Sequence, residues 1–289
     1  MATRRTPEGT VFDHGAQYFT ARDLRFSAMI EAWQQAGVAA PWLGRIVSLE
    51  GGGMRESEPL TRYVGTPGMT AIAKHLASEQ QVTLGARIVA PERRGALWRL
   101  ADETGQEQGE FDLVLVAVPP EQAAPLVATS SLLSREVTQV LMRPCWAVMA
   151  TFNAPVNASF DGAFVHDSPL SWIARNNSKP ERAPQPETWV LHASSDWSVA
   201  NLERPAEEVA ALLLAAARDA CPGGLWEPSQ AIAHRWRYAL PQASLPGSAY
   251  FDAAAKLGIC GDWCGGPRVE GAALSGLALA EEVLRYLGI

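Results

Sequence analysis

The residues best suited to chemistry lie near the end of the chain, where a short apolar strand runs into glycines and then into a helix. The strand starts at Leu257 and ends at Gly261 and Asp262, and apolar positions recur at helical spacing from about Val269. A helix N-terminus presents unpaired N–H groups and partial positive charge, which suit a phosphate or an electron-rich ring edge. Asp262 would accept hydrogen bonds from sugar hydroxyls. An ordinary strand-to-helix connection fits the same spacing equally well.

The elements that must position such residues follow two patterns. Residues 112–118 form a continuous apolar run ended by two prolines, which is typical of a strand buried on both faces of a sheet. Shorter strands are predicted over 145–152, 162–166, 170–175, 188–194 and 231–240, with a helix over 205–220. Strands in succession favour an antiparallel sheet, distinct from the dinucleotide-type elements. The proline-rich segment 177–186 is expected to be an exposed loop that could cover the site.

Composition narrows the classes of function. Of the 289 residues, 47% are hydrophobic, which is enough to form a buried core. The net charge of −7 argues against a basic surface that binds nucleic acid. No apolar run reaches the roughly 18 residues of a membrane span, and the N-terminus lacks a signal-peptide pattern. A cytoplasmic protein without membrane partners is expected. The four cysteines do not suggest a disulfide framework, and no spacing predicts a metal site.

Five blocks of sequence carry a family resemblance. They are residues 13–23, 172–182, 189–193, 234–236 and 261–276, the last reading GDWCGGPRVEGAALSG. Together they resemble the flavin amine oxidase superfamily, and especially its bacterial renalase-like members. The resemblance implies bound FAD and an α/β (α+β) fold: a Rossmann-like FAD-binding domain with an inserted antiparallel-sheet substrate domain.

The resemblance also implies which residues bind the cofactor. Gly15, Ala16 and Gln17 would pass beside the isoalloxazine ring, Ile88 or Val89 would lie near adenine, and Ala117 belongs to the strand that returns to the nucleotide. The C-terminal segment would contribute Gly261, Asp262, Arg268, Val269, Glu270, Gly271 and Ala272. Residues 1–20, 80–120 and 241–289 would form the FAD-binding domain, and residues 21–79 and 121–240 the substrate domain.

One part of the family pattern is missing. Dinucleotide-binding flavoproteins usually open with a strand, G-x-G-x-x-G and a helix, and this sequence contains no such motif. The resemblance begins at Met1, so roughly forty residues, the size of a βαβ unit, are expected to be absent from the chain. The FAD-binding domain is therefore expected to be incomplete.

Similarity to renalases implies an activity, namely oxidation of the 2- or 6-dihydro isomers of NAD(P)H to NAD(P)⁺ while O₂ is reduced to H₂O₂. Tyr18, Trp172 and Trp236 would wall the substrate ring, and Arg175, Asn176, His192, His234 or Arg237 would offer polar contacts. Each polar residue fits equally well as a satisfied hydrogen-bonding group of a strand or as a surface charge. Two other functions stay open: a flavin amine oxidase acting on a small amine, and a non-catalytic fragment without flavin.

Overall fold

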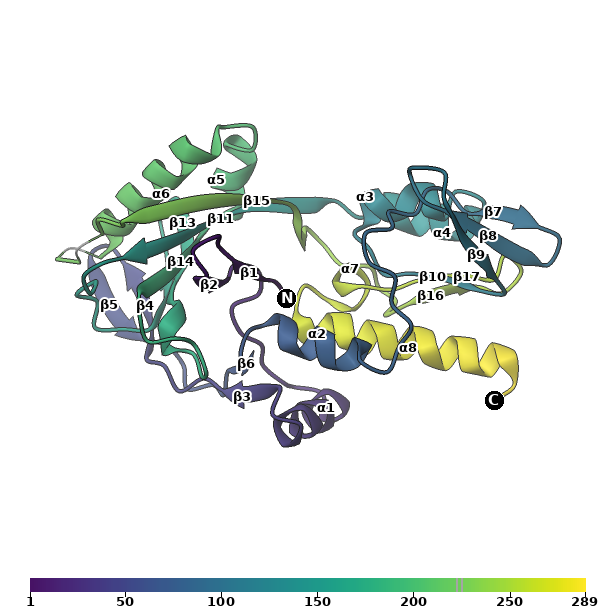
Figure 1. Cartoon of the computed structure of the whole chain (residues 1–289), viewed down its shortest axis with the longest axis horizontal. Coiled ribbons are helices and arrows are strands. Elements are labelled where there is room, and N and C mark those ends of the chain that lie inside the picture. The colour runs from purple at the N-terminus through teal and green to yellow at the C-terminus, as the bar shows by residue number, and fades with distance from the viewer. Residues whose placement is uncertain (222, 225) are drawn as a thin grey trace. The chain divides into compact units, whose positions relative to one another are not determined.

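The computed structural model describes residues 1–221, 223–224 and 226–289. The chain forms two compact units, which we call unit 1 (Met1–Ser78 with Pro144–Ala239) and unit 2 (Glu79–Arg143 with Leu240–Ile289) (Figure 1). Each unit combines helices with β-sheet, so the predicted α/β class is confirmed. These units group residues by contact. The division into FAD-binding and substrate domains, which places residues 1–20 and 121–143 differently, remains a prediction.

Unit 1 is built on a seven-stranded sheet with the order β15-β11-β14-β13-β12-β4-β5. The pairs β11–β14, β14–β13, β13–β12 and β4–β5 are antiparallel, whereas β12 and β4 are parallel. The strands predicted from the sequence are all present, but the sheet is mixed, because β4 joins it from a much earlier part of the chain. Their bounds are β4 (Ile46–Glu50), β5 (Gly53–Glu56), β11 (Met142–Phe152), β12 (Gly162–Val165), β13 (Leu170–Arg175), β14 (Glu187–Ala193) and β15 (Gln230–Pro241).

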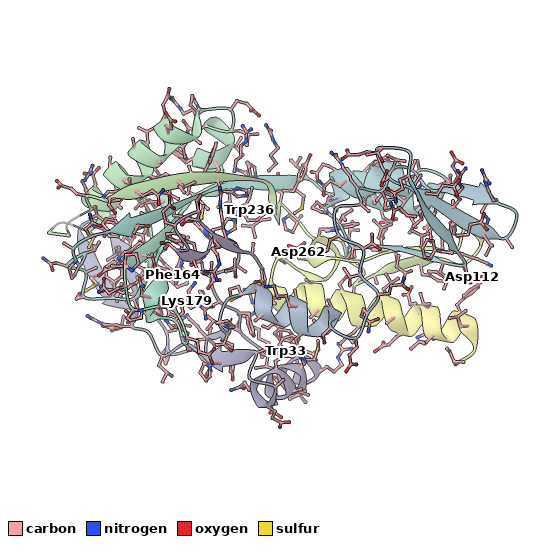
Figure 2. The ribbon with its side chains drawn as sticks, viewed as in Figure 1. Trp33, Asp112, Phe164, Lys179, Trp236 and Asp262 are labelled. Atoms are coloured by element: carbon pink, nitrogen blue, oxygen red, sulfur yellow. The ribbon has the colours of Figure 1, made fainter. Side chains whose placement is uncertain are left out.

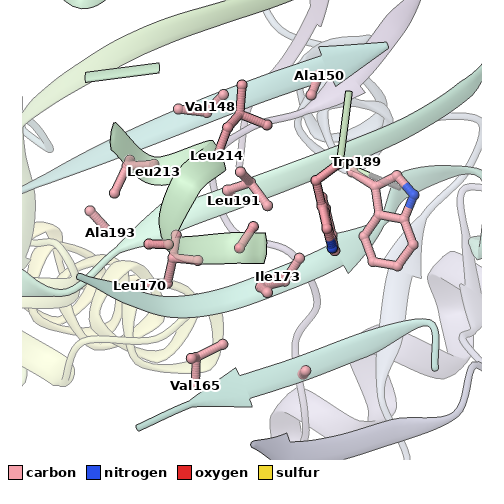
Figure 3. Close-up of a cluster of buried hydrophobic side chains, with 14 of the residues drawn as sticks. Val148, Ala150, Val165, Leu170, Ile173, Trp189, Leu191, Ala193, Leu213 and Leu214 are labelled. Atoms are coloured by element: carbon pink, nitrogen blue, oxygen red, sulfur yellow. The ribbon is translucent and has the colours of Figure 1, made fainter. Parts of the chain in front are cut away.

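One face of this sheet packs against helix α6 (Ala206–Ala220). Alternate strand residues point to it, among them Trp189 and Leu191 of β14, and they meet Leu213 and Leu214 of the helix (Figure 3). Trp189 lies edge to face with Trp226, with ring centroids 5.0 Å apart. This face is the apolar core of unit 1, and it leaves the opposite face free to carry polar side chains.

The remaining elements of unit 1 are short, apart from α1. Asp23 caps α1, accepting a hydrogen bond from the Arg25 N–H, and the backbone leaves the helix through Gly37 at φ +70°. The elements are β1 (Thr3–Arg5), β2 (Val11–Asp13), α1 (Leu24–Gln35), β3 (Ala39–Pro41), β6 (Tyr63–Gly65), α2 (Thr70–Ala77), the 3₁₀ turn Asn176–Ser178 and α5 (Ser195–Ala200).

Unit 2 contains the predicted strand, glycine turn and helix. Strand β17 (Leu257–Ile259) pairs in parallel with β10 (Val114–Val116) and antiparallel with β16 (Tyr250–Asp252). Helix α8 (Val269–Leu287) begins at the predicted residue, after an unforeseen short helix α7 (Asp262–Gly265). The other elements are β7 (Glu92–Arg94), β8 (Leu97–Ala101), β9 (Glu107–Phe111), α3 (Pro120–Ala123), the 3₁₀ turn Ala124–Leu126 and α4 (Ser131–Thr138). Among the described residues, no helix combines the length and apolar character needed to cross a membrane.

Candidate functional site

The second face of the unit 1 sheet, which we call the open face, collects most of the site residues predicted for this unit. Trp172 of β13 stands opposite His192 of β14, and β15 contributes His234 and Trp236. The segment that follows β2 lies against these residues. Its His14 carbonyl oxygen accepts a hydrogen bond from Trp236 Nε1 (3.0 Å) and lies 3.2 Å from His192 Nε2. The sheet and the segment 14–18 therefore meet at this point.

Three imidazoles gather there with one indole. The His14 ring lies 5.0 Å from the rings of both His234 and Trp236, and the His234 and Trp236 rings are 4.4 Å apart. Burial, the nearby His234 and Arg4 lower the pKa of His14 to about 4. Burial also lowers the pKa of His192 to about 4, and burial with the Arg4 charge lowers that of His234. This group of rings is consequently uncharged near neutral pH.

The hydrogen bond of His192 fixes its tautomer. A carbonyl oxygen only accepts hydrogen bonds, so the Nε2 atom that faces the His14 carbonyl must carry the proton. In a neutral ring the other nitrogen, Nδ1, then has a lone pair and acts as an acceptor. His192 is therefore arranged to receive a hydrogen bond and not to give one through Nδ1.

A second group of aromatic side chains lies on the open face. Tyr18 lies 5.4 Å from the Trp172 ring and 6.3 Å from that of Trp42, while Phe164 meets Trp172 edge to face at 4.8 Å. Figure 2 labels Phe164 and Trp236, one residue from each of the two groups of rings. Gly162 makes room for the indole, because a Cβ there would lie 2.9 Å from the Trp172 ring.

Two buried polar atoms on the open face have no hydrogen-bonding partner in the part of the chain that the structure describes. They are Nε1 of Trp172, a residue that is 6% exposed, and Nδ1 of His14. An unmet buried donor costs about 1 to 3 kcal/mol. Each atom therefore keeps a hydrogen-bonding capacity that the described part of the chain does not fill.

A buried charge network, which we call the Asp13 cluster, holds the segment 13–17. The Asp13 carboxylate accepts hydrogen bonds from Thr3 Oγ1 (2.7 Å), from the Met69 N–H (2.9 Å) and from Arg182 (2.6 Å), and Lys179 Nζ lies 3.7 Å away. Burial alone would raise the pKa of Asp13, but the charges of Lys179 and Arg182 hold it below its ordinary value. The cluster supports the backbone at Gly15 and Ala16, the segment that the family resemblance places beside the cofactor.

Sequence reasoning missed this cluster. Segment 177–186 was expected to be exposed, yet the side chains of Lys179 and Arg182 are 0% and 3% exposed; Glu181 and residues 183–186 are exposed as predicted. The residues that meet are 166 and 169 positions apart, so spacing offers no signal for them. The hydrogen-bonding partners of Gln17 were not foreseen either: Lys179 donates to its Oε1 atom at 3.1 Å.

The described contacts of Arg175 and Asn176 lie away from the rings of the open face. Arg175 turns toward the α6 side, where it lies over the Trp189 ring at 4.9 Å and donates to the Ala158 carbonyl at 2.9 Å. Asn176 bonds the backbone of Val11 and Asp13. The geometry gives both residues a structural role, and their contact with substrate stays a prediction.

In unit 2, the turn between β17 and α8 is shaped by glycines. The Gly261 N–H donates to Ser275 Oγ at 2.9 Å, and burial raises the pKa of Asp262, which follows it. A Cβ on Gly271 would lie 2.2 Å from the Gly266 carbonyl oxygen, so the turn and the first turn of α8 touch through their backbones. This packing fixes where α8 begins.

The start of α8 fits the cofactor edge expected of it. Arg268 occupies the N-cap position without a side-chain hydrogen bond, and Val269, Glu270, Gly271 and Ala272 form the first turn. The first N–H groups of a helix lack partners within the helix, so they can face an electron-rich ring edge.

The two remaining predicted cofactor residues lie elsewhere in unit 2. Ala117 follows β10, and Val89 is 44% exposed with its N–H donating to the Ala101 carbonyl. No contact described for either residue tests its assignment to the nucleotide.

The depressed pKa of His192 predicts an acid-sensitive stability. The unfolded ring titrates near 6.5 and the folded ring near 4, so stability is complete above pH 6.5 and falls as the pH drops toward 4. The share due to His192 is on the order of 3 kcal/mol. Urea unfolding from pH 7 to 4 should show a shallower loss in His192→Asn than in the parent, whereas His75→Asn, at an exposed position on α2, should follow the parent. Equal slopes in all three proteins would refute a neutral His192.

Comparison with known proteins agrees with this arrangement. The family model for flavin containing amine oxidoreductase matches residues 8–284. The chain is similar to cyclohexylamine oxidase from Brevibacterium oxydans IH-35A, with a TM-score of 0.73 and 11% identity over 99% of this chain and 91% of that one. It is also similar to a triple mutant of putrescine oxidase, with a TM-score of 0.71 and 12% identity over 98% and 90% of the two chains.

A third similar structure is a candidate protoporphyrinogen oxidase from Exiguobacterium sp. 255-15. Its TM-score is 0.64 at 17% identity, over 79% of this chain and 53% of that one, so the chain spans about half of that protein's length. At these identities the structural matches show the shared fold alone. The family match covers almost the whole described sequence, and the chain therefore belongs to the flavin containing amine oxidoreductase family.

Proposed function

We propose that the protein is an FAD-dependent oxidoreductase of renalase type, which oxidises 2- or 6-dihydro isomers of NAD(P)H to NAD(P)⁺ and passes the electrons to O₂ to give H₂O₂. Family membership supports a flavin cofactor and an oxidoreductase activity. The finer assignment to FAD rests on the sequence resemblance, and the assignment to this substrate rests on the open face of unit 1.

The charge state of the open face carries the proposal. Its rings are neutral imidazoles and aromatic side chains, and the carboxylate beneath it, Asp13, is already paired with Lys179 and Arg182. A protonated amine would need an unpaired carboxylate or an open aromatic cage. An uncharged ring with a carboxamide suits this surface better, because it can stack on the rings and use the unmet polar atoms.

Individual residues then take defined roles. Tyr18, Trp172 and Trp236 would flank the ring of the substrate, and the Trp172 Nε1–H would donate to a carboxamide oxygen. The Nδ1 lone pair of His192 would accept from the carboxamide N–H. His14 and His234, being neutral, would leave the surroundings of the substrate ring uncharged.

The cofactor residues would orient a bound flavin. When bound, a flavin supplies a hydride acceptor and a route for electrons to O₂. In unit 2, the first turn of α8 would direct the N–H groups of Val269, Glu270 and Gly271 at an electron-rich edge of the ring.

Spectroscopy separates this proposal from its alternatives. The purified protein should show flavin absorption bands that bleach anaerobically with 2- or 6-dihydro NAD(P)H isomers and not with putrescine or cyclohexylamine. Bleaching by an amine alone would favour the amine oxidase, and the absence of flavin bands even after incubation with FAD would favour a non-catalytic fragment.

Trp172 offers a sharper test of the open face. Trp172→Phe should slow substrate-driven flavin reduction about tenfold, because one hydrogen bond to a substrate is worth about 1 to 1.5 kcal/mol. Trp226→Phe is the matched control, since its buried Nε1 atom also lacks a described partner but belongs to the α6 side of the sheet. Equal rates in the two variants would remove Trp172 from the substrate site.

A further inference from the structure

Lys179 is completely buried, although it follows a polar turn in a segment with the composition of a surface loop. Its side chain is 0% exposed, and its ammonium nitrogen lies 3.1 Å from Gln17 Oε1, 3.7 Å from Asp13 Oδ2 and 5.7 Å from the centre of the Trp42 ring. Figure 2 labels this side chain within unit 1. Burying an ammonium group costs several kcal/mol unless other groups compensate.

Charge pairing with Asp13 does not by itself account for this lysine. Arg182 already binds the same carboxylate oxygen, Asp13 Oδ2, at 2.6 Å. Two buried cations therefore share one carboxylate, and the Asp13 cluster carries one excess positive charge. A methionine of similar length would fill the same space without that cost, so Lys179 must contribute through what its ammonium group touches.

The contact that distinguishes it is the bond to Gln17. The Gln17 amide nitrogen donates to the carbonyl oxygens of Asp13 and Gly15, the latter at 3.1 Å. Its oxygen must then accept from a donor, and Lys179 supplies that donor at 3.1 Å. The lysine thereby fixes which way the Gln17 amide points, and with it the turn of backbone that contains Gly15 and Ala16.

We propose that Lys179 is a positioning residue, which orients the Gln17 amide and so holds the Gly15–Gln17 backbone in place while supplying positive charge beneath the open face. This inference rests on the proposed function in one respect, namely that the Gly15–Gln17 backbone borders the flavin. The charge of Lys179 also acts on the imidazoles. Burial is the largest cause of the lowered pKa of His192, and the positive charge of Lys179 lowers it further. The other charged or titratable neighbour of His192 is His14. Those of His14 are His234 and Arg4, which lower its pKa, and Asp13, which raises it.

The test compares Lys179→Met with Lys179→Arg, with Lys74→Met at an exposed position on α2 as control. All are measured without added flavin or substrate, so the result does not depend on the enzyme's activity. Histidine-selective NMR should show that the titration midpoint of the His192 ring rises by at least about 0.5 pH units in Lys179→Met, because a nearby positive charge is removed. The Gln17 amide protons should exchange faster in that variant. Lys179→Arg and Lys74→Met should match the parent in both measurements.

Two results would overturn the proposal. One is a folded Lys179→Met protein with the parent's His192 midpoint and Gln17 exchange rate. The other is a Lys179→Arg protein that departs from the parent in both, since arginine keeps the charge and the donor. If Lys179→Met fails to fold, the comparison of Lys179→Arg with the parent still tests the proposal. If the NMR results are as expected but no dihydro NAD(P)H isomer reduces the flavin, the proposed function is wrong and the positioning role of Lys179 is retained.

Discussion

Asp13→Ala is expected to destabilise unit 1 by about 4 kcal/mol, because it leaves Lys179 and Arg182 buried without their carboxylate. The same change removes the acceptor of the Thr3 hydroxyl and of the Met69 N–H, which also lie in buried or half-buried positions. Urea unfolding at pH 7, followed by hydrogen exchange of peptides from β13 and β14, would measure the loss where the cluster packs.

Two further variants serve as comparisons for Asp13→Ala. Asp112→Ala removes a carboxylate from an exposed loop position of unit 2 and should change stability by less than about 0.5 kcal/mol. Asp13→Asn keeps an oxygen acceptor and loses the charge, so it should fall between the parent and Asp13→Ala. A loss below about 1 kcal/mol in Asp13→Ala would mean that the two cations find other partners and that the cluster does not hold segment 13–17.

The sequence predicts the elements of this protein better than it predicts which way their side chains point. Strand β13 illustrates the reason. Leu170 and Trp172 have the same parity, yet Leu170 packs in the α6 core and Trp172 on the opposite face, because the register shifts between them. Periodicity read from Leu170 alone would exchange the two faces. Arg175 follows the shifted register and joins Trp189 on the α6 side.

The Asp13 cluster was beyond sequence reasoning for a different reason. Its charges come from the end of β2 and from a loop that precedes β14, and no local pattern relates them. The aromatic residues of the open face were easier to identify, because Tyr18, Trp172 and Trp236 belong to blocks with a family resemblance. Local pattern and resemblance thus located the rings, while long-range packing determined the charges beneath them.

The glycines around the start of α8 have a structural role that the sequence did not predict. The resemblance assigns Gly261 and Gly271 to cofactor binding, and the structure adds a close approach of backbone to backbone, since a Cβ on Gly265 would lie 2.3 Å from the Gly271 carbonyl oxygen. The glycine turn is therefore needed to build the start of α8, whatever that helix faces.

Gly271→Ala is accordingly expected to destabilise unit 2 by about 3 kcal/mol, because its Cβ would stand 2.2 Å from one backbone oxygen and 2.9 Å from another, and neither can rotate away. Gly276→Ala, five residues along the same helix, has nothing within 4 Å of the added Cβ and should stabilise by about 0.5 to 1 kcal/mol.

Hydrogen exchange of the α8 peptides would show the opposite signs of the two changes directly, with faster exchange in Gly271→Ala and slower exchange in Gly276→Ala. If Gly271→Ala kept the parent's protection and lost only flavin binding, the close backbone contact would be unimportant for stability. The turn would then serve the cofactor alone. Loss of protection before any flavin is added would instead show that the helix start is built by these glycines, and that cofactor binding depends on it.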